Sequence, residues 1–242
     1  MEIATFAVEA EVEQHHWWFV GRRRLLKALI EELRLPRDAA VLDLGTGTGA
    51  QLRLLGEMGF ENRSGLDLHD EAIRWCAEKG LGEVRKGDVR DVPFADQTFD
   101  LVLATDIIEH VDDDGRALSE VRRVLKAGGR AVITVPAFQA LWGRQDDVAH
   151  HKRRYRRPEL LGKIAAAQLS CRESFYFNYL LFGPTWAARQ VIRLLGIRLD
   201  SENQVNTPGL NRILTRIFEF DVRTARALHP PCGVSILAVA TR

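Results

Sequence analysis

The chain has 242 residues and nearly balanced charge, with 34 Lys and Arg against 33 Asp and Glu. Hydrophobic residues make up 46% of the sequence and charged residues 28%, which excludes a disordered chain and suits one large α/β domain. Only three cysteines are present, far apart and without CxxC spacing, so a disulfide scaffold and a cysteine-based metal cluster are excluded. This cysteine usage suits a reducing compartment, and we expect a cytoplasmic protein.

The charge is unevenly distributed along the chain. Residues 1–150 carry 19 basic and 27 acidic side chains, a net charge of −8. Residues 151–242 carry 15 basic and 6 acidic side chains, a net charge of +9. We therefore expect the C-terminal part to contact an anionic group: a phosphate, a carboxylate, a lipid headgroup or nucleic acid. The opening residues 1–14 are acidic and lack the basic segment of a signal peptide.

The hydrophobic pattern over residues 17–136 predicts strands that alternate with helices. Apolar residues at helical spacing fill residues 17–35, and Pro36 ends that helix. A short apolar strand at 40–44 leads into a glycine loop and a second helix. Further strands are predicted at 64–68, 83–86, 99–104 and 130–135, with helices at 70–79 and 115–125 and a turn at 126–129. This alternation is typical of βαβ units and a parallel sheet.

The alternation ends after residue 135. A polar, basic segment at 143–157 precedes a predicted helix at 158–168 and a strand around 172–177. Amphipathic helices follow at about 181–195 and 209–228, before a last strand at 233–240. We interpret 178–231 as a helical insertion between the last two strands. Its most apolar stretch contains Arg189, Arg193 and Pro184, so it is not a conventional membrane span.

The run Asp43-Leu44-Gly45-Thr46-Gly47-Thr48-Gly49 lies between a predicted strand and a predicted helix, as a nucleotide-binding loop does. Glycines let the backbone approach a ligand closely, and the helix N-terminus offers N–H donors. Asp67 ends the next strand, 22 residues after Gly45, where an acidic side chain can bind a ribose. The loop alone is compatible with a dinucleotide such as NAD, with S-adenosylmethionine, or with a glycine-rich turn that binds nothing.

Further motifs follow the loop in order: Gly87-Asp88-Val89, the strand at 99–104, Ile108-Glu109-His110, and the run at 125–130 before the fifth strand. With these motifs, residues 38–136 resemble class I S-adenosylmethionine-dependent methyltransferases. Within that class they are similar to the small-molecule group that includes the ubiquinone-biosynthesis O-methyltransferases. The resemblance implies a doubly wound, seven-stranded Rossmann-like sheet whose last strand is antiparallel. It also implies a methyltransferase domain over 37–242, preceded by an N-terminal helical lid segment at 1–36.

The resemblance implies a binding site for S-adenosylmethionine on these motifs. Gly45 and Gly47 are expected to line the methionine tail of the cofactor, with Asp43 orienting its amino group. The remaining contacts are expected from Asp67 with Leu68 at the ribose, Asp88 and Val89 at the adenine, and Thr105 and Asp106 near the sulfonium. The alternative for Asp67 and Asp88 is a role as a helix cap or as a solvated strand end.

The aromatic segment at 15–19, followed by three arginines, is the distinctive part of the N-terminal region. Related methyltransferases cover the cofactor with an N-terminal segment, so Trp18 and Arg22 are expected to act as lid contacts. The alternative is simple packing of the aromatic side chains against the domain.

Transfer of a methyl group to a hydroxyl requires a group that removes the hydroxyl proton. The candidate bases are His110, His150 and His151. Asp106, Glu109 and His110 lie at i, i+3 and i+4, and similar segments of the ubiquinone O-methyltransferases are associated with a divalent metal. Asp106 stands where that group has Glu, so we assign no metal here and leave a base, pocket or structural role open for His110.

The basic run at 144–157 follows the fifth strand, at the edge of the sheet where ligands bind in such folds. We expect it to bind an anionic or lipid-linked acceptor through Arg153, Arg154 and Tyr155, the alternative being a solvated basic face. A nucleic-acid role is not favoured, because the isoelectric point is only 7.8 and no recognition helix accompanies the run.

These observations predict an enzyme that transfers a methyl group from S-adenosylmethionine to a small acceptor, at oxygen rather than nitrogen or carbon. The alternatives are an interaction module that keeps the cofactor fold without activity, and an NAD-dependent reductase. The apolar stripes of the insertion helices can pack within the monomer, cover the acceptor pocket, contact a second subunit, or lie on a bilayer surface.

Overall fold

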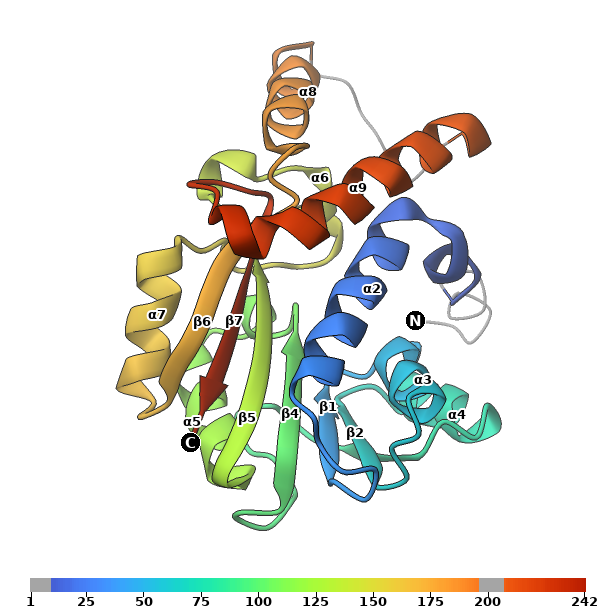
Figure 1. The fold of residues 1–242 in the computed structure, drawn as a ribbon, viewed down its shortest axis with the longest axis vertical. Helices are drawn as coiled ribbons and strands as arrows, with labels where there is room; N and C mark the ends of the chain where they lie inside the picture. Colours follow the sequence, from blue (N-terminus) through green and yellow to red (C-terminus); the bar gives the residue numbers. More distant parts are fainter. Residues whose placement is uncertain (1–9, 196–206) are drawn as a thin grey trace.

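A computed structural model describes residues 10–195 and 207–242, so the start of the predicted lid and part of the insertion lie outside the described residues. Seven strands form one sheet in the order β3-β2-β1-β4-β5-β7-β6 (Figure 1). Only β7 runs antiparallel, to β5 on one side and to β6 on the other. The predicted doubly wound sheet with an antiparallel last strand is confirmed. The strands are β1 (Val41–Leu44), β2 (Arg63–Asp67), β3 (Glu83–Lys86), β4 (Phe99–Thr105), β5 (Leu125–Pro136), β6 (Ser170–Phe177) and β7 (Ser235–Thr241).

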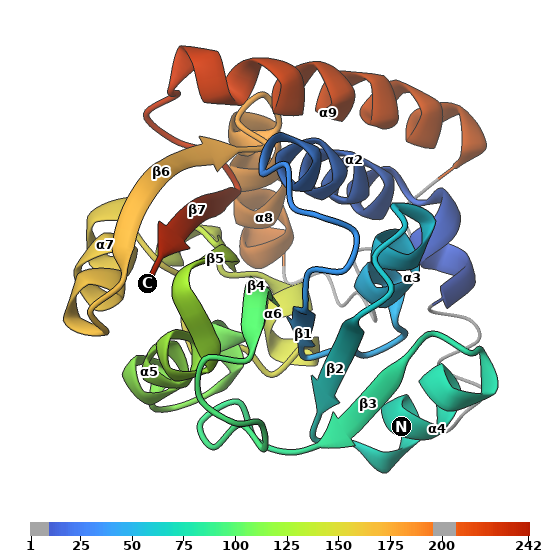
Figure 2. The same ribbon diagram turned by 60° about the horizontal axis from the view of Figure 1, so that its bottom comes forward.

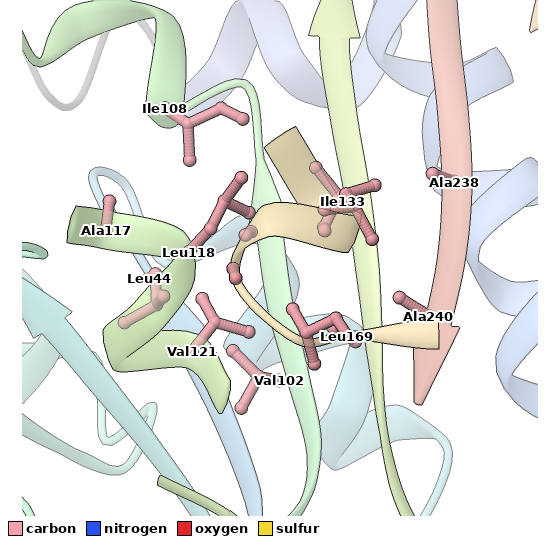
Figure 3. Close-up of a cluster of buried hydrophobic side chains, with 14 of the residues drawn as sticks. Leu44, Val102, Ile108, Ala117, Leu118, Val121, Ile133, Leu169, Ala238 and Ala240 are labelled. Carbon is pink, nitrogen blue, oxygen red and sulfur yellow. The ribbon is translucent and has the colours of Figure 1, made fainter. Parts of the chain in front are cut away.

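Helices cover both faces of the sheet (Figure 2). One face is covered by α5 (Asp114–Val124) and α7 (Arg157–Ala166), and the other by α2 (Trp17–Glu32), α3 (Ala50–Glu57) and α4 (Asp70–Glu78). Both faces of the central strands are therefore buried: Val102 and Ile133 join the cluster drawn in Figure 3, while Leu103 and Val132 join the opposite one. Burial on both faces explains why these strands read as continuous apolar runs.

The turn predicted at 126–129 is instead part of β5. The pairing of β5 with β4 shifts between Phe99 and Leu101, where residues 126–129 have no partner in the register. Gly128 has a φ of +75°, a conformation that glycine adopts without strain. The glycines thus form an irregularity inside one long strand and do not precede it.

The insertion carries two helices between β6 and β7, as predicted: α8 (Phe182–Leu195) and α9 (Pro208–Leu228). Asp221 on the buried face of α9 accepts hydrogen bonds from the backbone N–H groups of Asn178, at 2.7 Å, and Leu180, at 2.9 Å. These bonds fix α9 to the end of β6. Within the described residues, none of the helices combines the length and the apolar character that crossing a bilayer requires.

The N-terminal helix α2 lies along α9 (Figures 1 and 2). Gly21 lets the two helices approach closely, because a Cβ atom at this position would lie 2.0 Å from the ring of Phe218. The Trp18 ring stacks on the same phenyl ring with centroids 5.4 Å apart, and Leu25 and Ile30 are buried in the core. The helix of the predicted lid segment is therefore firmly packed on the domain.

Candidate functional site

The candidate site lies where the parallel strands end. The loops after β1, β4 and β5 meet at this edge of the sheet, which is the usual ligand-binding edge of an open α/β fold. A short helix that the sequence did not predict, α6 (Arg144–Val148), lies within the basic run at this edge (Figure 1). The 3₁₀ turns η1 (Ile108–His110) and η2 (Gln139–Leu141) follow β4 and β5.

The loop after β1 turns through three glycines with positive φ: Gly45 at +74°, Gly47 at +52° and Gly49 at +76°. A Cβ atom on Gly45 would lie 2.5 Å from Ile107, whereas a Cβ atom on Gly47 would meet nothing within 4 Å. Gly45 is thus required for packing, and Gly47 leaves open space beside the backbone. This open space is where a bound molecule can approach the loop.

Asp43 ends up fully buried beneath this loop. Neither carboxylate oxygen of Asp43 has a hydrogen-bond partner among the described residues. The nearby Thr46 hydroxyl donates instead to the backbone carbonyls of Asp43 and Leu66. Burial, together with the charge of Asp67, raises the pKa of Asp43 to about 8. An unpartnered buried carboxyl group is costly, and a cationic ligand group would stabilise its ionised form.

Asp67, at the end of β2, is part of the loop's scaffold. Its Oδ2 accepts a hydrogen bond of 2.8 Å from the Gly47 N–H, and its Oδ1 accepts one of 2.9 Å from the His69 N–H. The side chain of the next residue, Leu68, is 57% exposed and offers an apolar surface beside it. The predicted ribose contact therefore comes from a carboxylate whose position the loop already fixes.

At the end of β3, Asp88 is engaged within the molecule. Its carboxylate accepts hydrogen bonds of 2.6 and 2.9 Å from Arg90, and these bonds lower the pKa of Asp88. The Val89 side chain is buried in the core. The predicted adenine contact of Asp88 would have to share the carboxylate with Arg90.

Thr105 and Asp106, which were expected near the sulfonium, follow one another at the end of β4 and are called the floor of the site below. Each of them is contacted by a different helix. Thr105 accepts a hydrogen bond of 2.9 Å from the Gln51 side chain, and Asp106 forms an ion pair of 2.6 Å with Arg22 of α2. Glu13, ahead of α2, accepts a hydrogen bond from Thr48 of the glycine loop. The N-terminal segment thus touches the glycine loop through Glu13 and the floor through Arg22. Glu13 and the α3 residue Gln51 are contacts that the sequence reasoning missed.

A cavity of about 350 Å³ lies beside Arg22 and Asp106. The N-terminal segment supplies an aromatic wall, and α6, α8 and the loops after β4 and β5 supply polar and charged groups. The residues that line it include His16, Trp17, Trp18, Phe19, Arg22, Asp106, Glu109, Asp146, His151, Arg154, Thr185 and Arg189. The expected lid residues Trp18 and Arg22 both contribute to this wall.

The acidic centre of the cavity wall is Asp146, which is fully buried. It accepts hydrogen bonds of 2.8 Å from His151 Nδ1 and from Arg154 Nε, and one of 2.7 Å from the Gly143 N–H. Burial alone would raise the pKa of Asp146, but the bonds from His151 and Arg154 outweigh it and lower the pKa to about 2. Because this carboxylate only accepts, it places the His151 proton on Nδ1 and leaves Nε2 as an acceptor.

Glu109 is the second buried carboxyl group of the cavity. Neither of its carboxylate oxygens has a hydrogen-bond partner among the described residues, and burial and the charge of Asp106 raise its pKa well above the usual range. The His110 and His151 rings meet edge to face, 4.7 Å apart. Ligand atoms of Glu109, His110 and His151 lie within 4.8 Å of one another, a donor set that suits a divalent cation. Asp106 is paired with Arg22 and lies outside this set.

Four residues expected at the acceptor do not line the cavity: His110, His150, Arg153 and Tyr155. Tyr155 is fully buried, and its hydroxyl donates a hydrogen bond of 2.7 Å to Asp114. Arg153 pairs with the same carboxylate at 3.1 Å. His150 is exposed, at a φ of +56°. Arg153 and Tyr155 are thus engaged by the buried Asp114, and Arg154 by the buried Asp146. Of the other basic side chains of the run, Arg144, Lys152 and Arg156 are exposed.

Residues 42–133 match a protein family described as a methyltransferase domain. The demethylmenaquinone methyltransferase of Thermotoga maritima is 37% identical over 115 residues, 46% of this chain and 48% of that protein. The phosphatidylethanolamine N-methyltransferase of Cereibacter sphaeroides is 36% identical over 107 residues, 40% of this chain and 50% of that protein. The chain therefore spans about half the length of these curated relatives.

Among solved structures, the fold matches the Haloferax volcanii protein that was determined in complex with the Trm112 methyltransferase activator. The TM-score is 0.65 at 21% identity, and the match covers 98% of this chain and 94% of the other. A second match, from Bacillus halodurans, has a TM-score of 0.59 at 18% identity and covers 88% of this chain and 96% of the other. At these identities the likeness shows that the whole arrangement of strands and helices is shared.

Proposed function

We propose that this chain, which carries a class I S-adenosylmethionine-dependent methyltransferase domain, transfers a methyl group to a small acceptor bound in the aromatic cavity. The domain match and the fold support the cofactor class. The cavity adjoins the floor residues Thr105 and Asp106 through Arg22, so the acceptor would lie beside the predicted cofactor site. Activity and acceptor are our inference from this juxtaposition.

The observation that carries the proposal is the unpartnered carboxyl group of Asp43 beside the open space at Gly47. An S-adenosylmethionine tail presents an ammonium group, which would give the buried carboxylate its missing donors. The backbone at Gly47 can approach the same ligand without steric conflict. The residues present therefore fit the cofactor that the family implies.

When bound, S-adenosylmethionine supplies an electrophilic methyl group on a sulfonium. The residues of the chain would then bind the reactants, align them and exclude water from the site. Asp43 would bind the ammonium, Asp67 the ribose hydroxyls and Leu68 an apolar face of the nucleoside. The aromatic wall would exclude water from the acceptor, with Trp18 and Arg22 closing the side next to the floor.

For a hydroxyl acceptor, we propose that His151 removes the proton. Asp146 orients the imidazole and stabilises the imidazolium that forms, the arrangement that activates hydroxyl groups in catalytic triads. His110, whose ring packs edge to face against that of His151, would help to hold the imidazole in position. This arrangement supports methylation at oxygen over nitrogen or carbon.

The cavity supports an acceptor with an apolar body more than a free anion. Arg154 and Arg22 pair with Asp146 and Asp106, so the arginines of the wall are partly neutralised. The aromatic side chains provide a flat apolar surface. Two of the curated relatives are named for demethylmenaquinone and phosphatidylethanolamine, both lipids. We therefore favour a lipid-linked acceptor that carries a hydroxyl group.

Transfer of a labelled methyl group tests the proposal. Purified protein incubated with methyl-labelled S-adenosylmethionine and fractionated lipid extracts should label a lipid product. His151→Gln should lower the rate by about 10²–10⁴-fold, the usual worth of a general base, with little change in cofactor affinity. His150→Gln is the matched control and should retain the rate, since that side chain is exposed. Equal rates in both variants would contradict the role of His151.

The donor set of Glu109, His110 and His151 supports one alternative for the proton. A divalent cation held there would lower the pKa of a bound hydroxyl group and make a base unnecessary. Dialysis against a chelator distinguishes the two. Activity that survives chelation supports the histidine base, whereas activity that is lost and restored by added Zn²⁺ or Mg²⁺ supports the cation.

A further inference from the structure

One side of α9 exposes an apolar stripe to solvent. Leu210, Ile213 and Phe220 are 41%, 58% and 58% exposed, and Ile217 lies half-buried between them. Their spacing of three and four residues places them on one side of the helix. The side that packs on α2 and β6 is a different one, formed by Phe218, Asp221 and Ala225. The fold therefore leaves this stripe without a partner within the described residues.

A row of arginines flanks the stripe. Arg212, Arg216 and Arg223 are exposed, lie next to one another around the helix, and form no ion pair with a described residue. The acidic residues of α9 are already engaged: Glu219 pairs with Arg24, and Asp221 is buried against the backbone after β6. The exposed side of α9 is thus apolar on one edge and cationic on the other.

The neighbouring helix α8 adds a second exposed apolar group. Trp186 is 47% exposed and Leu194 is 83% exposed, with Val191 between them in the sequence. Thr185 and Arg189 of the same helix line the acceptor cavity. In Figure 1, α8 extends beyond the end of the sheet where the parallel strands end, and α9, which packs on β6 and α2, passes close to this end. The exposed apolar groups and the cavity are therefore at the same end of the molecule.

We infer that this face of α8 and α9 binds the surface of an anionic lipid bilayer. The apolar stripe would enter the boundary between headgroups and acyl chains, as in interfacial amphipathic helices. The arginine row would remain at the level of the phosphates, because long cationic side chains extend toward the headgroups while their stems stay apolar. Trp186 would lie at the same level, which tryptophan prefers.

A bilayer explains the face better than a second copy of the chain. A symmetric dimer places the same patch on both partners, so the unpaired arginines of one copy would face those of the other. An anionic surface instead offers each arginine a counter-charge. The bilayer contact is inferred from this surface alone. Its purpose, the delivery of a lipid-linked acceptor to the cavity, rests on the proposed function.

Co-sedimentation with vesicles tests the inference. Wild-type protein should sediment with phosphatidylcholine vesicles that contain about 30% phosphatidylglycerol at low salt, and should be released at high salt. Pure phosphatidylcholine vesicles should bind it at least tenfold more weakly. The pairs Arg216→Glu with Arg223→Glu, and Ile213→Asp with Phe220→Asp, should each weaken binding to anionic vesicles at least tenfold.

The control pair, Lys79→Glu with Arg85→Glu, makes the same charge change at α4 and β3, at the other edge of the sheet. It should bind anionic vesicles within about twofold of the wild type, and all variants should melt near the wild-type temperature. Absence of wild-type binding at low salt, or an equal loss in the control pair, would overturn the inference. So would a dimer, measured by light scattering, that only the α9 variants abolish. Cofactor affinity measured on the same samples separates this result from the fate of the proposed function.

Discussion

Asp43 and Glu109 are buried carboxyl groups whose oxygens have no hydrogen-bond partner among the described residues. Asp43 lies at a predicted cofactor position, and Glu109 lines the cavity. Their cost to the fold is understandable if a ligand supplies the missing partners, because strain of this kind is tolerated where it serves binding. Asp43 is the clearer case, since the glycine loop holds the space beside it open.

The raised pKa of Asp43 predicts a specific pH dependence of stability. The folded protein keeps the Asp43 proton up to about pH 8, whereas the unfolded chain loses it near its ordinary pKa of 3.8. Unfolding therefore releases a proton in this window, and the free energy of unfolding falls as the pH rises. In Asp43→Asn this dependence is absent. In urea denaturation without cofactor, the free energy of unfolding of the variant should rise relative to that of the wild type by about 1 kcal/mol per pH unit, up to about pH 8. Parallel curves would contradict the buried, protonated state.

Asp67 gives a second prediction at this scale. Asp67→Asn removes a charged acceptor for the ribose and weakens the bond that fixes Gly47. Hydrogen bonds to charged groups are worth roughly 1.5–3 kcal/mol, so the dissociation constant of S-adenosylmethionine should rise at least about tenfold. Asp70→Asn removes a nearby exposed carboxylate that pairs with Lys86, and it should leave the affinity unchanged. Similar affinities for the two variants would remove Asp67 from the site.

The residues of the basic run show where sequence reasoning fails. Arg154 and Tyr155 were expected to face an acceptor, yet each is buried against an acid that the chain brings from elsewhere: Asp146 eight residues earlier, and Asp114 forty-one residues earlier. Such pairings depend on the tertiary fold, and local charge does not reveal them. The glycine loop was easier to place, since the order of strand, loop and helix determines its position locally; its binding of a cofactor stays a prediction.

At the scale of whole elements, the packing of α2 on α9 connects the N-terminal segment to the insertion. The contact depends on Gly21, where any side chain would meet Phe218. It also places Trp18 between the cavity and the core, stacked on Phe218 and Phe177. The position of the cavity's aromatic wall is thus set by a helix–helix contact that the sequence did not indicate.

Gly21→Ala tests this contact. Although alanine favours a helix, the added methyl group would overlap the Phe218 ring, and overpacking typically costs about 1–3 kcal/mol. The free energy of unfolding should therefore fall. The matched control is Gly162→Ala in α7, where a Cβ atom would meet nothing within 4 Å. That change should raise the stability by about 0.5–1 kcal/mol. A gain in both variants would show that α2 and α9 are not closely packed.

The strands and long helices were predicted to within a few residues, because their apolar periodicity directly reflects burial on the two faces of the sheet. The exceptions are informative. The segment 126–129, with its two glycines, looks like a turn but lies inside β5 as an unpaired irregularity, because the strand pairs with β4 on both sides of it, at Leu125 and from Arg130 onward. The short helix α6 was not predicted because its four polar residues and single valine carry no apolar period.

At the scale of the whole molecule, the site is divided between two parts of the chain. The parallel part of the sheet supplies the glycine loop and the acids at the ends of β1 and β2. The N-terminal segment, α6 and α8 supply the cavity. The domain match ends at residue 133, before α6 and α8. The glycine loop and these acids therefore lie within the matched residues 42–133, whereas most of the cavity lining lies outside them.

Calorimetric titration with S-adenosylmethionine at pH 7 tests the central claim most directly. We predict one binding site and, in two buffers of different ionisation enthalpy, the release of close to one proton as the ammonium group ionises Asp43. Asp43→Asn should bind more weakly and release no proton, while NADH should give no binding heat in either protein. Absence of binding by the wild type would indicate an interaction module that keeps only the fold. Binding of NADH in place of S-adenosylmethionine would contradict the cofactor assignment altogether.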